Sequence, residues 1–339
     1  MGEDIPDAPS GACGHRDLGI RHGYDRYKAI SDFEIRVQIH KSQCASSGGV
    51  PSWHADQTRS TGHWHPSRAH LSPAPKCREP LNAFASMTGE RIRHNRELWA
   101  LVNAHFTDAE ADARWLTSDM EWGLFRIPES ELCVLGDVAG ADALELGCGS
   151  AYVSAHLARS GARVIGVDLS RAQLSTARRC QERFGVSFPL VEANAECVPF
   201  RAPAFDLIVS EYGVSPWCDP SQWVAEAARL LRPGGRLIFL TNSVLASLCV
   251  PDHGGFAGEH LLRSPRDVAP ISWPGGGVEY HPSHGDWIAM LRSAGLVVDG
   301  MHELYAPRTG AAPQFYEIVT KEWAMKWPAE EVWLASRPT

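Results

Sequence analysis

The stretch LELGCGSAYVSAHLA, residues 144–158, decides the fold. A short apolar run ends in Gly-Cys-Gly, and a helix-like pattern follows at once. Glycine costs backbone entropy, so two glycines separated by one residue mark a tight turn or a place where a ligand approaches the main chain. The stretch therefore predicts a strand, a turn and a helix, with a ligand at the turn.

Strand-like and helix-like patterns alternate along the chain beyond residue 87. This alternation predicts an α/β sandwich around a mostly parallel sheet. Helices are expected at residues 91–106, 171–183, 220–231 and 286–293. The strands are expected at residues 143–146, 162–169, 187–193, 205–212, 236–241, 296–304 and 331–336.

The chain divides by composition into three parts. Residues 1–86 are rich in Ser, Gly, Pro, His and Arg and are expected to be a disordered extension. Their His and Cys residues show no known metal-ligand spacing, so no metal is expected. Residues 87–134 are predicted to form an N-terminal helical cap. Residues 135–339 form the main domain, in which the Pro- and Gly-rich segment 242–283 is predicted to be a lid over a substrate.

The charge distribution argues against some partners. The net charge is −8, and residues 1–86 hold 10 of the 32 basic and 9 of the 40 acidic residues, so the main body is the acidic part. Nucleic acid is therefore not expected as a partner. No run of about 18 apolar residues predicts a membrane span. The nine scattered cysteines are interpreted as reduced thiols, which favours the cytoplasm. Nothing in the sequence indicates an oligomeric state.

Polar residues at the carboxyl ends of the strands are candidate ligand contacts, because open α/β sheets bind ligands there. Asp168 lies at the end of the second strand, 21 residues after Gly147, where an acid can accept hydrogen bonds from a ribose. A dinucleotide site would need glycine at position 152, which is Tyr152. Glu145 would repel a pyrophosphate but suits an ammonium group.

With these residues in place, the chain resembles the class I S-adenosylmethionine-dependent methyltransferases over about residues 135–336, and most closely the small-molecule branch with the quinone C-methylases. The matching segments are ELGCGSA, GVDLS, NAECVPF, FDLIVSEY and LLRPGGRLIFL, in this order. Two departures are Ala151, where the family has a third glycine, and Asn194, where it has an Asp.

The resemblance implies S-adenosylmethionine as cofactor. It also implies a three-layer, Rossmann-like sandwich whose mostly parallel sheet has seven strands, the last of them antiparallel to the rest. It also implies a set of cofactor-binding residues at the strand ends. These are Glu145, Gly147, Cys148, Gly149, Asp168, Leu169, Asn194, Ala195, Glu196, Glu211 and Tyr212.

The predicted activity is in-line transfer of the cofactor's methyl group to a small organic acceptor. Glu211, His281 and His284 are candidate bases. Aromatic residues predicted to line the acceptor site are Trp122, Phe125, Tyr212, Trp273 and Tyr280. Two alternatives stay open here: a binding or scaffolding protein on a catalytically degenerate methyltransferase fold, and an NAD-dependent oxidoreductase, which Tyr152 disfavours.

Overall fold

The computed structural model describes residues 83–339 apart from 273–276 and 310–317. Seven strands of this part of the chain form one sheet in the order β10-β11-β7-β6-β3-β4-β5. Strand β11 runs antiparallel to both of its neighbours, and the remaining neighbours are parallel. The strands are β3 (Asp142–Leu146), β4 (Arg163–Asp168), β5 (Leu190–Glu192), β6 (Phe205–Glu211), β7 (Leu231–Asn242), β10 (Val297–Leu304) and β11 (Glu330–Ser336).

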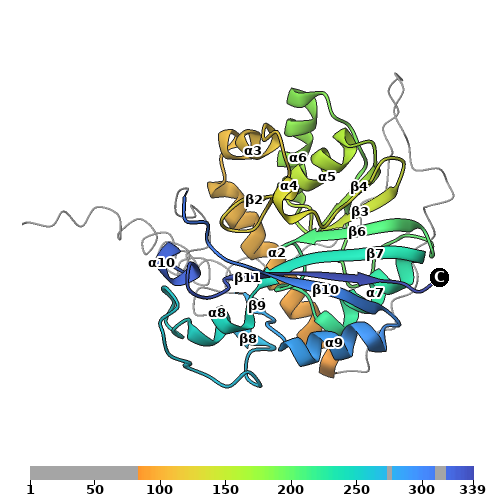
Figure 1. Cartoon of the computed structure of the whole chain (residues 1–339). Coiled ribbons are helices and arrows are strands. Elements are labelled where there is room, and N and C mark those ends of the chain that lie inside the picture. The colour runs from red at the N-terminus through yellow and green to blue at the C-terminus, as the bar shows by residue number, and fades with distance from the viewer. Residues whose placement is uncertain (1–82, 273–276, 310–317) are drawn as a thin grey trace, which may run out of the picture. The chain divides into compact units, whose positions relative to one another are not determined.

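Helices cover both faces of this sheet (Figure 1). Successive residues of a strand point to opposite faces, so Ala143 packs in the core beneath one helical layer and Leu144 in the core beneath the other. This arrangement confirms the predicted three-layer sandwich with an antiparallel last strand. One layer contains α3 (Asp108–Trp115), α5 (Tyr152–Arg159) and α6 (Arg171–Phe184), and the other contains α7 (Pro220–Leu230) and α9 (His284–Ser293).

Local capping explains where the central helices begin. The Ser170 hydroxyl accepts a hydrogen bond from the Gln173 amide at the start of α6, and the Asp219 carboxylate accepts one from the Ser221 amide at the start of α7. Helix α7 ends at Leu230, one residue before the expected end, and β7 begins at Leu231, five residues before the expected start at 236.

Several further elements lie outside the main sheet. A third apolar cluster, which includes Leu124 and Phe125, packs the turn between β1 and β2 against α8 and α10. These outer elements are α2 (Ala83–His105), β1 (Glu121–Trp122), β2 (Ile127–Pro128), α4 (Glu129–Leu132), α8 (Val244–Cys249), β8 (Ile271–Ser272), β9 (Val278–Glu279) and α10 (Lys321–Ala324).

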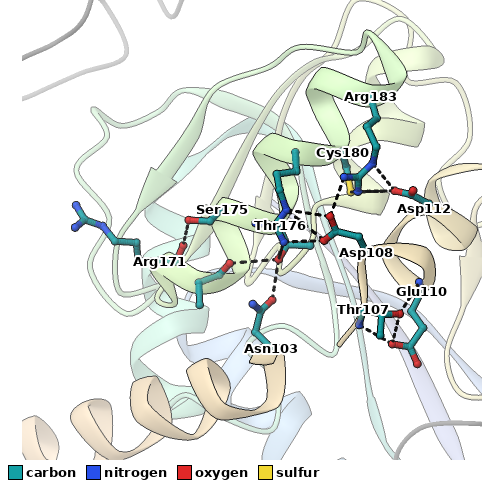
Figure 2. Close-up of polar contacts among 12 residues, drawn as sticks. Asn103, Thr107, Asp108, Glu110, Asp112, Arg171, Ser175, Thr176, Cys180 and Arg183 are labelled. Carbon is teal, nitrogen blue, oxygen red and sulfur yellow. Dashed lines mark hydrogen bonds and ion pairs between the residues drawn. The ribbon is translucent and has the colours of Figure 1, made fainter. Parts of the chain in front are cut away.

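Polar contacts fasten α2 and α3 to α6. Figure 2 shows Asn103 at the end of α2, whose side-chain oxygen accepts a hydrogen bond of 3.1 Å from the Thr176 hydroxyl. In the same view, Arg183 of α6 reaches both Asp108 (3.0 Å) and Asp112 (2.6 Å) of α3. These contacts hold the two N-terminal helices against the sheet domain.

Other sequence expectations fall partly outside the described residues. The expected disordered extension, residues 1–86, lies outside them except for its last four residues, which belong to α2. Five of the described cysteines are free thiols, namely Cys133, Cys148, Cys180, Cys218 and Cys249. None of the described helices combines the length and apolar character needed to cross a membrane.

Candidate active site

A cavity of about 650 Å³ opens at the carboxyl ends of β3, β4 and β6. Here the chain order reverses, because β4 lies on one side of β3 and β6 on the other. We call the lining residues that follow β3, β4 and β5 the strand-end wall. They are Glu145, Gly147, Cys148, Gly149, Ser150, Asp168, Leu169, Ala193, Asn194 and Ala195.

Much of the rest of the cavity is lined by helix α2, by the turn between β1 and β2 and by Tyr212, which follows β6; we call these parts the outer wall. Helix α2 contributes Ile92, Trp99 and Val102, and the turn between β1 and β2 contributes Leu124 and Phe125. Glu211 and Tyr212, at the end of β6, also line the cavity.

The Gly-Cys-Gly turn needs glycine for two reasons. Gly147 has a φ of +71°, and a Cβ on it would collide with the main chain of Gly213, so the loops after β3 and β6 cross backbone to backbone. Gly149 also has a positive φ (+52°), but a Cβ there would meet only Gln173 at 3.8 Å. Ala151, in the position of the family's third glycine, adopts the left-handed conformation with a φ of 60°.

Asp168 lies in the strand-end wall with its carboxylate held by main-chain amides. Gly149 N donates to one oxygen at 2.8 Å and Ser170 N to the other at 2.7 Å. Burial nevertheless raises the pKa of Asp168 to about 6, because the amides offset only part of the desolvation. The carboxylate is thus oriented and poorly hydrated on the cavity surface.

Glu145 is 2% exposed and contacts the first turn of α5. Its carboxylate accepts hydrogen bonds from the Ser154 amide (2.8 Å) and the Ser154 hydroxyl. It caps a helix whose N-cap residue, Ala151, offers no side-chain acceptor. Burial raises the pKa of Glu145 to about 8.

Some residues of the loop after β5 line the cavity, and others contact neighbouring elements instead. Asn194 and Ala195 line the cavity, but Glu196 does not. The Glu196 carboxylate forms an ion pair with Arg91 of α2 (2.6 Å) and accepts a hydrogen bond from the Asp219 amide (2.8 Å). In this structure Glu196 ties α2 to the loop before α7, and its role as a cofactor contact stays a prediction.

Glu211 is the acidic group between the two walls. Its carboxylate accepts a hydrogen bond from the Gly123 amide at 3.1 Å. Burial raises the pKa of Glu211, although Arg114 and Tyr152 act in the opposite direction. The Arg114 guanidinium lies over the Tyr152 ring at 5.3 Å, and both residues line the cavity. Neither was selected from the sequence, since Tyr152 was considered only for its effect on glycine spacing.

Both candidate histidines lie away from the cavity. His281 is 2% exposed and its Nε2 pairs with Glu279 at 2.8 Å, while His284 Nε2 pairs with Glu331 at 2.7 Å. Each has an acidic partner in the scaffold, so the structure does not support either as a base on the cavity surface.

The expected aromatic contacts are only partly brought together. Phe125 and Tyr212 line the cavity. Trp122 is fully buried, with its indole N–H donated to Glu129, and Tyr280 packs against the Arg91 guanidinium away from the cavity. Trp273 lies outside the described residues.

The predicted lid contributes none of its described residues to the cavity. The β8–β9 hairpin contacts α2 instead, where the Gly277 amide donates to His94 Nε2 (2.9 Å) and the Val278 amide to the Asn95 side chain (3.4 Å). Helix α2 lines the cavity, and the role of residues 242–283 as a substrate lid stays a prediction.

Comparison with known proteins assigns the family. Residues 144–239 match the family model described as a methyltransferase domain. The chain is 35% identical over 177 residues to a ubiquinone biosynthesis O-methyltransferase of Ralstonia nicotianae, covering 51% of this chain and 70% of that protein. It is 33% identical over 106 residues to a demethylmenaquinone methyltransferase of Tropheryma whipplei, covering 31% of this chain and 43% of that one.

The fold comparison agrees. An S-adenosylmethionine-dependent methyltransferase from Mesorhizobium loti superposes with a TM-score of 0.50 at 20% identity, covering 61% of this chain and 96% of that chain. This chain belongs to the class I S-adenosylmethionine-dependent methyltransferases and is an enzyme of that family.

The strand-end wall fits the cofactor of this family. The half-buried Asp168 and the buried Glu145 present carboxyl groups with raised pKa values on the cavity surface, and S-adenosylmethionine carries hydroxyl and ammonium donors that complement such acceptors.

Proposed function

We propose that this enzyme methylates a hydroxyl of a small, uncharged ring compound, with Glu211 as the general base. The cofactor, when bound, supplies a methyl group already activated by its sulfonium. In this proposal Asp168, Leu169, Asn194, Ala195 and the Gly-Cys-Gly turn hold the cofactor, with Glu145 near its ammonium group.

The proposal rests on one observation: a carboxyl group with a raised pKa lies beside apolar side chains that line the cavity. Glu211 lies on the cavity and its pKa is raised by burial, so it is a better proton acceptor than a hydrated glutamate. Phe125, Trp99 and Val102 offer apolar surface for a ring.

The charged groups of the cavity favour an uncharged acceptor over an anion. Two of the three arginines on its surface have close carboxylate partners: Arg91 pairs with Glu196 (2.6 Å) and Arg126 with Glu121 (2.5 Å). Arg114 lies 3.8 Å from the same Glu121 oxygen and its Nη1 has no hydrogen-bond partner among the described groups, but the carboxyl groups of Glu211, Glu121 and Glu330 surround its charge. An anionic acceptor would also meet Glu211 and Asp168, so it would gain little attraction. The relatives named for ubiquinone biosynthesis support a hydroxylated ring.

The test uses 4-methylcatechol as an uncharged probe and 3,4-dihydroxybenzoate as its anionic analogue, with methyl-labelled S-adenosylmethionine and mass spectrometry of the products. We expect kcat/KM for 4-methylcatechol to be at least about tenfold higher, and Glu211→Gln to lower its kcat by about 100-fold or more. Equal use of both probes would contradict the uncharged class, and wild-type kcat in Glu211→Gln would contradict the base.

A further inference from the structure

We propose that Glu330, a residue outside the cavity lining, is a positioning residue that fixes the outer wall for the methyl acceptor. This inference rests on the proposed function, since it assumes that the turn between β1 and β2 and Tyr212 contact the acceptor. Glu330 is the first residue of β11, about 120 residues from Tyr212 and more than 200 from the turn in the sequence.

Glu330 contacts both parts of this wall with one carboxylate oxygen. Oε1 accepts a hydrogen bond from the Leu124 amide at 2.8 Å and another from the Tyr212 hydroxyl at 2.6 Å. Tyr212 also hydrogen bonds to the Asn242 side chain at 2.8 Å. The ring of Tyr212 is thereby fixed by two neighbouring strands, β11 and β7.

The turn is held by two carboxylates, one for each of two successive amides. Glu211 accepts from Gly123 N at 3.1 Å, and Glu330 accepts from Leu124 N. Gly123 has a φ of +70°, and a Cβ on it would collide with the Glu330 carboxylate, so the turn is seated directly on that group. Leu124 and Phe125, which follow, line the cavity.

Packing alone gives little reason for an acid at this position. The Glu330 side chain is fully buried, and Oε2 has no hydrogen-bond partner among the described groups. The pKa of Glu330 is raised to about 7, because burial, together with Glu211, outweighs the lowering by Tyr212, the Leu124 amide and Arg114. A buried carboxyl group with one unpartnered oxygen costs stability. The presence of this carboxyl group is explained by its two contacts, which fix the position of the turn and of the Tyr212 ring.

The experiment compares Glu330→Ala and Glu330→Gln in the full chain, with Glu331→Gln as matched control. Glu331 is the next residue on the same strand, is equally buried, and contacts His284 and Trp333 instead. Hydrogen exchange of the peptide covering residues 121–128 reports on the turn, and calorimetry with S-adenosylhomocysteine reports on the strand-end wall.

We expect Glu330→Ala to speed hydrogen exchange of the turn by at least about tenfold. It should also raise KM for 4-methylcatechol by about tenfold and change kcat less than KM. The affinity for S-adenosylhomocysteine should stay within about twofold of the wild-type value. Glu330→Gln should restore slow exchange, because its side-chain oxygen can still accept from Leu124 N. Glu331→Gln should leave the turn unchanged.

Unchanged turn exchange in Glu330→Ala would overturn the proposal, as would equal effects of Glu331→Gln. If Glu330→Ala does not fold, Gly123→Ala disturbs the same contact from the turn side, and an unchanged KM there would overturn it. If the wild-type enzyme does not methylate 4-methylcatechol, the proposed acceptor class fails, while the exchange measurement still decides the role of Glu330.

Discussion

The two walls of the cavity are built in different ways. The strand-end wall consists largely of main chain and short side chains that follow directly from strands of the sheet, such as the Gly147 turn and Asp168. The outer wall is assembled from segments far apart in the sequence, held together by side-chain contacts such as those of Glu330 and Glu196.

This difference suggests a division of labour. A wall fixed by sheet geometry suits a cofactor common to a large family, because its main chain is held by a neighbouring strand, as where the Cys148 amide donates to the Val167 carbonyl of β4. A wall that depends on individual side chains can change its shape with single substitutions, which suits an acceptor particular to one enzyme. The two walls should therefore respond separately to mutation.

The largest effect is expected for Gly147→Ala. The added methyl group would collide with the main chain of Gly213 and force a side chain into a positive φ, so we expect a loss of about 2–4 kcal/mol of stability and of measurable S-adenosylhomocysteine binding. Gly149→Ala is the control: its φ is also positive but its Cβ has room, so about 1 kcal/mol is expected. Urea unfolding measures both, and equal losses would show that the loop crossing is unimportant.

An intermediate effect is expected from pH. The pKa of Asp168 is raised to about 6, and only its ionised form accepts hydrogen bonds with both oxygens. The contribution of Asp168 to the affinity for S-adenosylhomocysteine should therefore be nearly complete at pH 7 and fall as the pH decreases through 6, by up to about tenfold at pH 5. Calorimetry in Asp168→Asn should show a lower affinity without this fall. A fall that persists in Asp168→Asn would belong to another group.

The smallest effect is expected for Arg183→Gln on α6. Its ion pairs with Asp108 and Asp112 are partly exposed, so solvent and salt screen them. The urea midpoint of unfolding should decrease only slightly at low salt. It should stay unchanged at 0.5 M salt, because dissolved ions then screen charges over little more than the distance between the paired atoms. A large decrease in the urea midpoint that persists at high salt would mean that the docking of α2 and α3 depends on these ion pairs.

The sequence correctly predicted the features that depend on residues close together in the chain. The seven strands and the central helices follow from apolar periodicity and from caps such as Ser170, which act within a few residues. Asp168 and Gly149 contact each other across one strand-helix unit, so their proximity follows from the fold.

Contacts between distant segments could not be predicted in this way. His281 and His284 were selected by residue type, but their acidic partners, Glu279 and Glu331, are set by packing. Glu330 lies one residue before the predicted start of its strand, and nothing in the local pattern indicates that its side chain reaches Leu124. The direction of the Glu196 side chain, toward Arg91, likewise depends on where α2 docks.

The measurement that tests the separation of the two walls most directly is the affinity for S-adenosylhomocysteine in Asp168→Asn and Phe125→Leu, determined by calorimetry at pH 7.5. Phe125→Leu keeps apolar volume in the cluster behind the turn while removing the ring. We expect Asp168→Asn to weaken binding by at least about tenfold and Phe125→Leu to leave it within about twofold, while raising KM for 4-methylcatechol. Equal losses of affinity in both variants, or none in Asp168→Asn, would contradict the account.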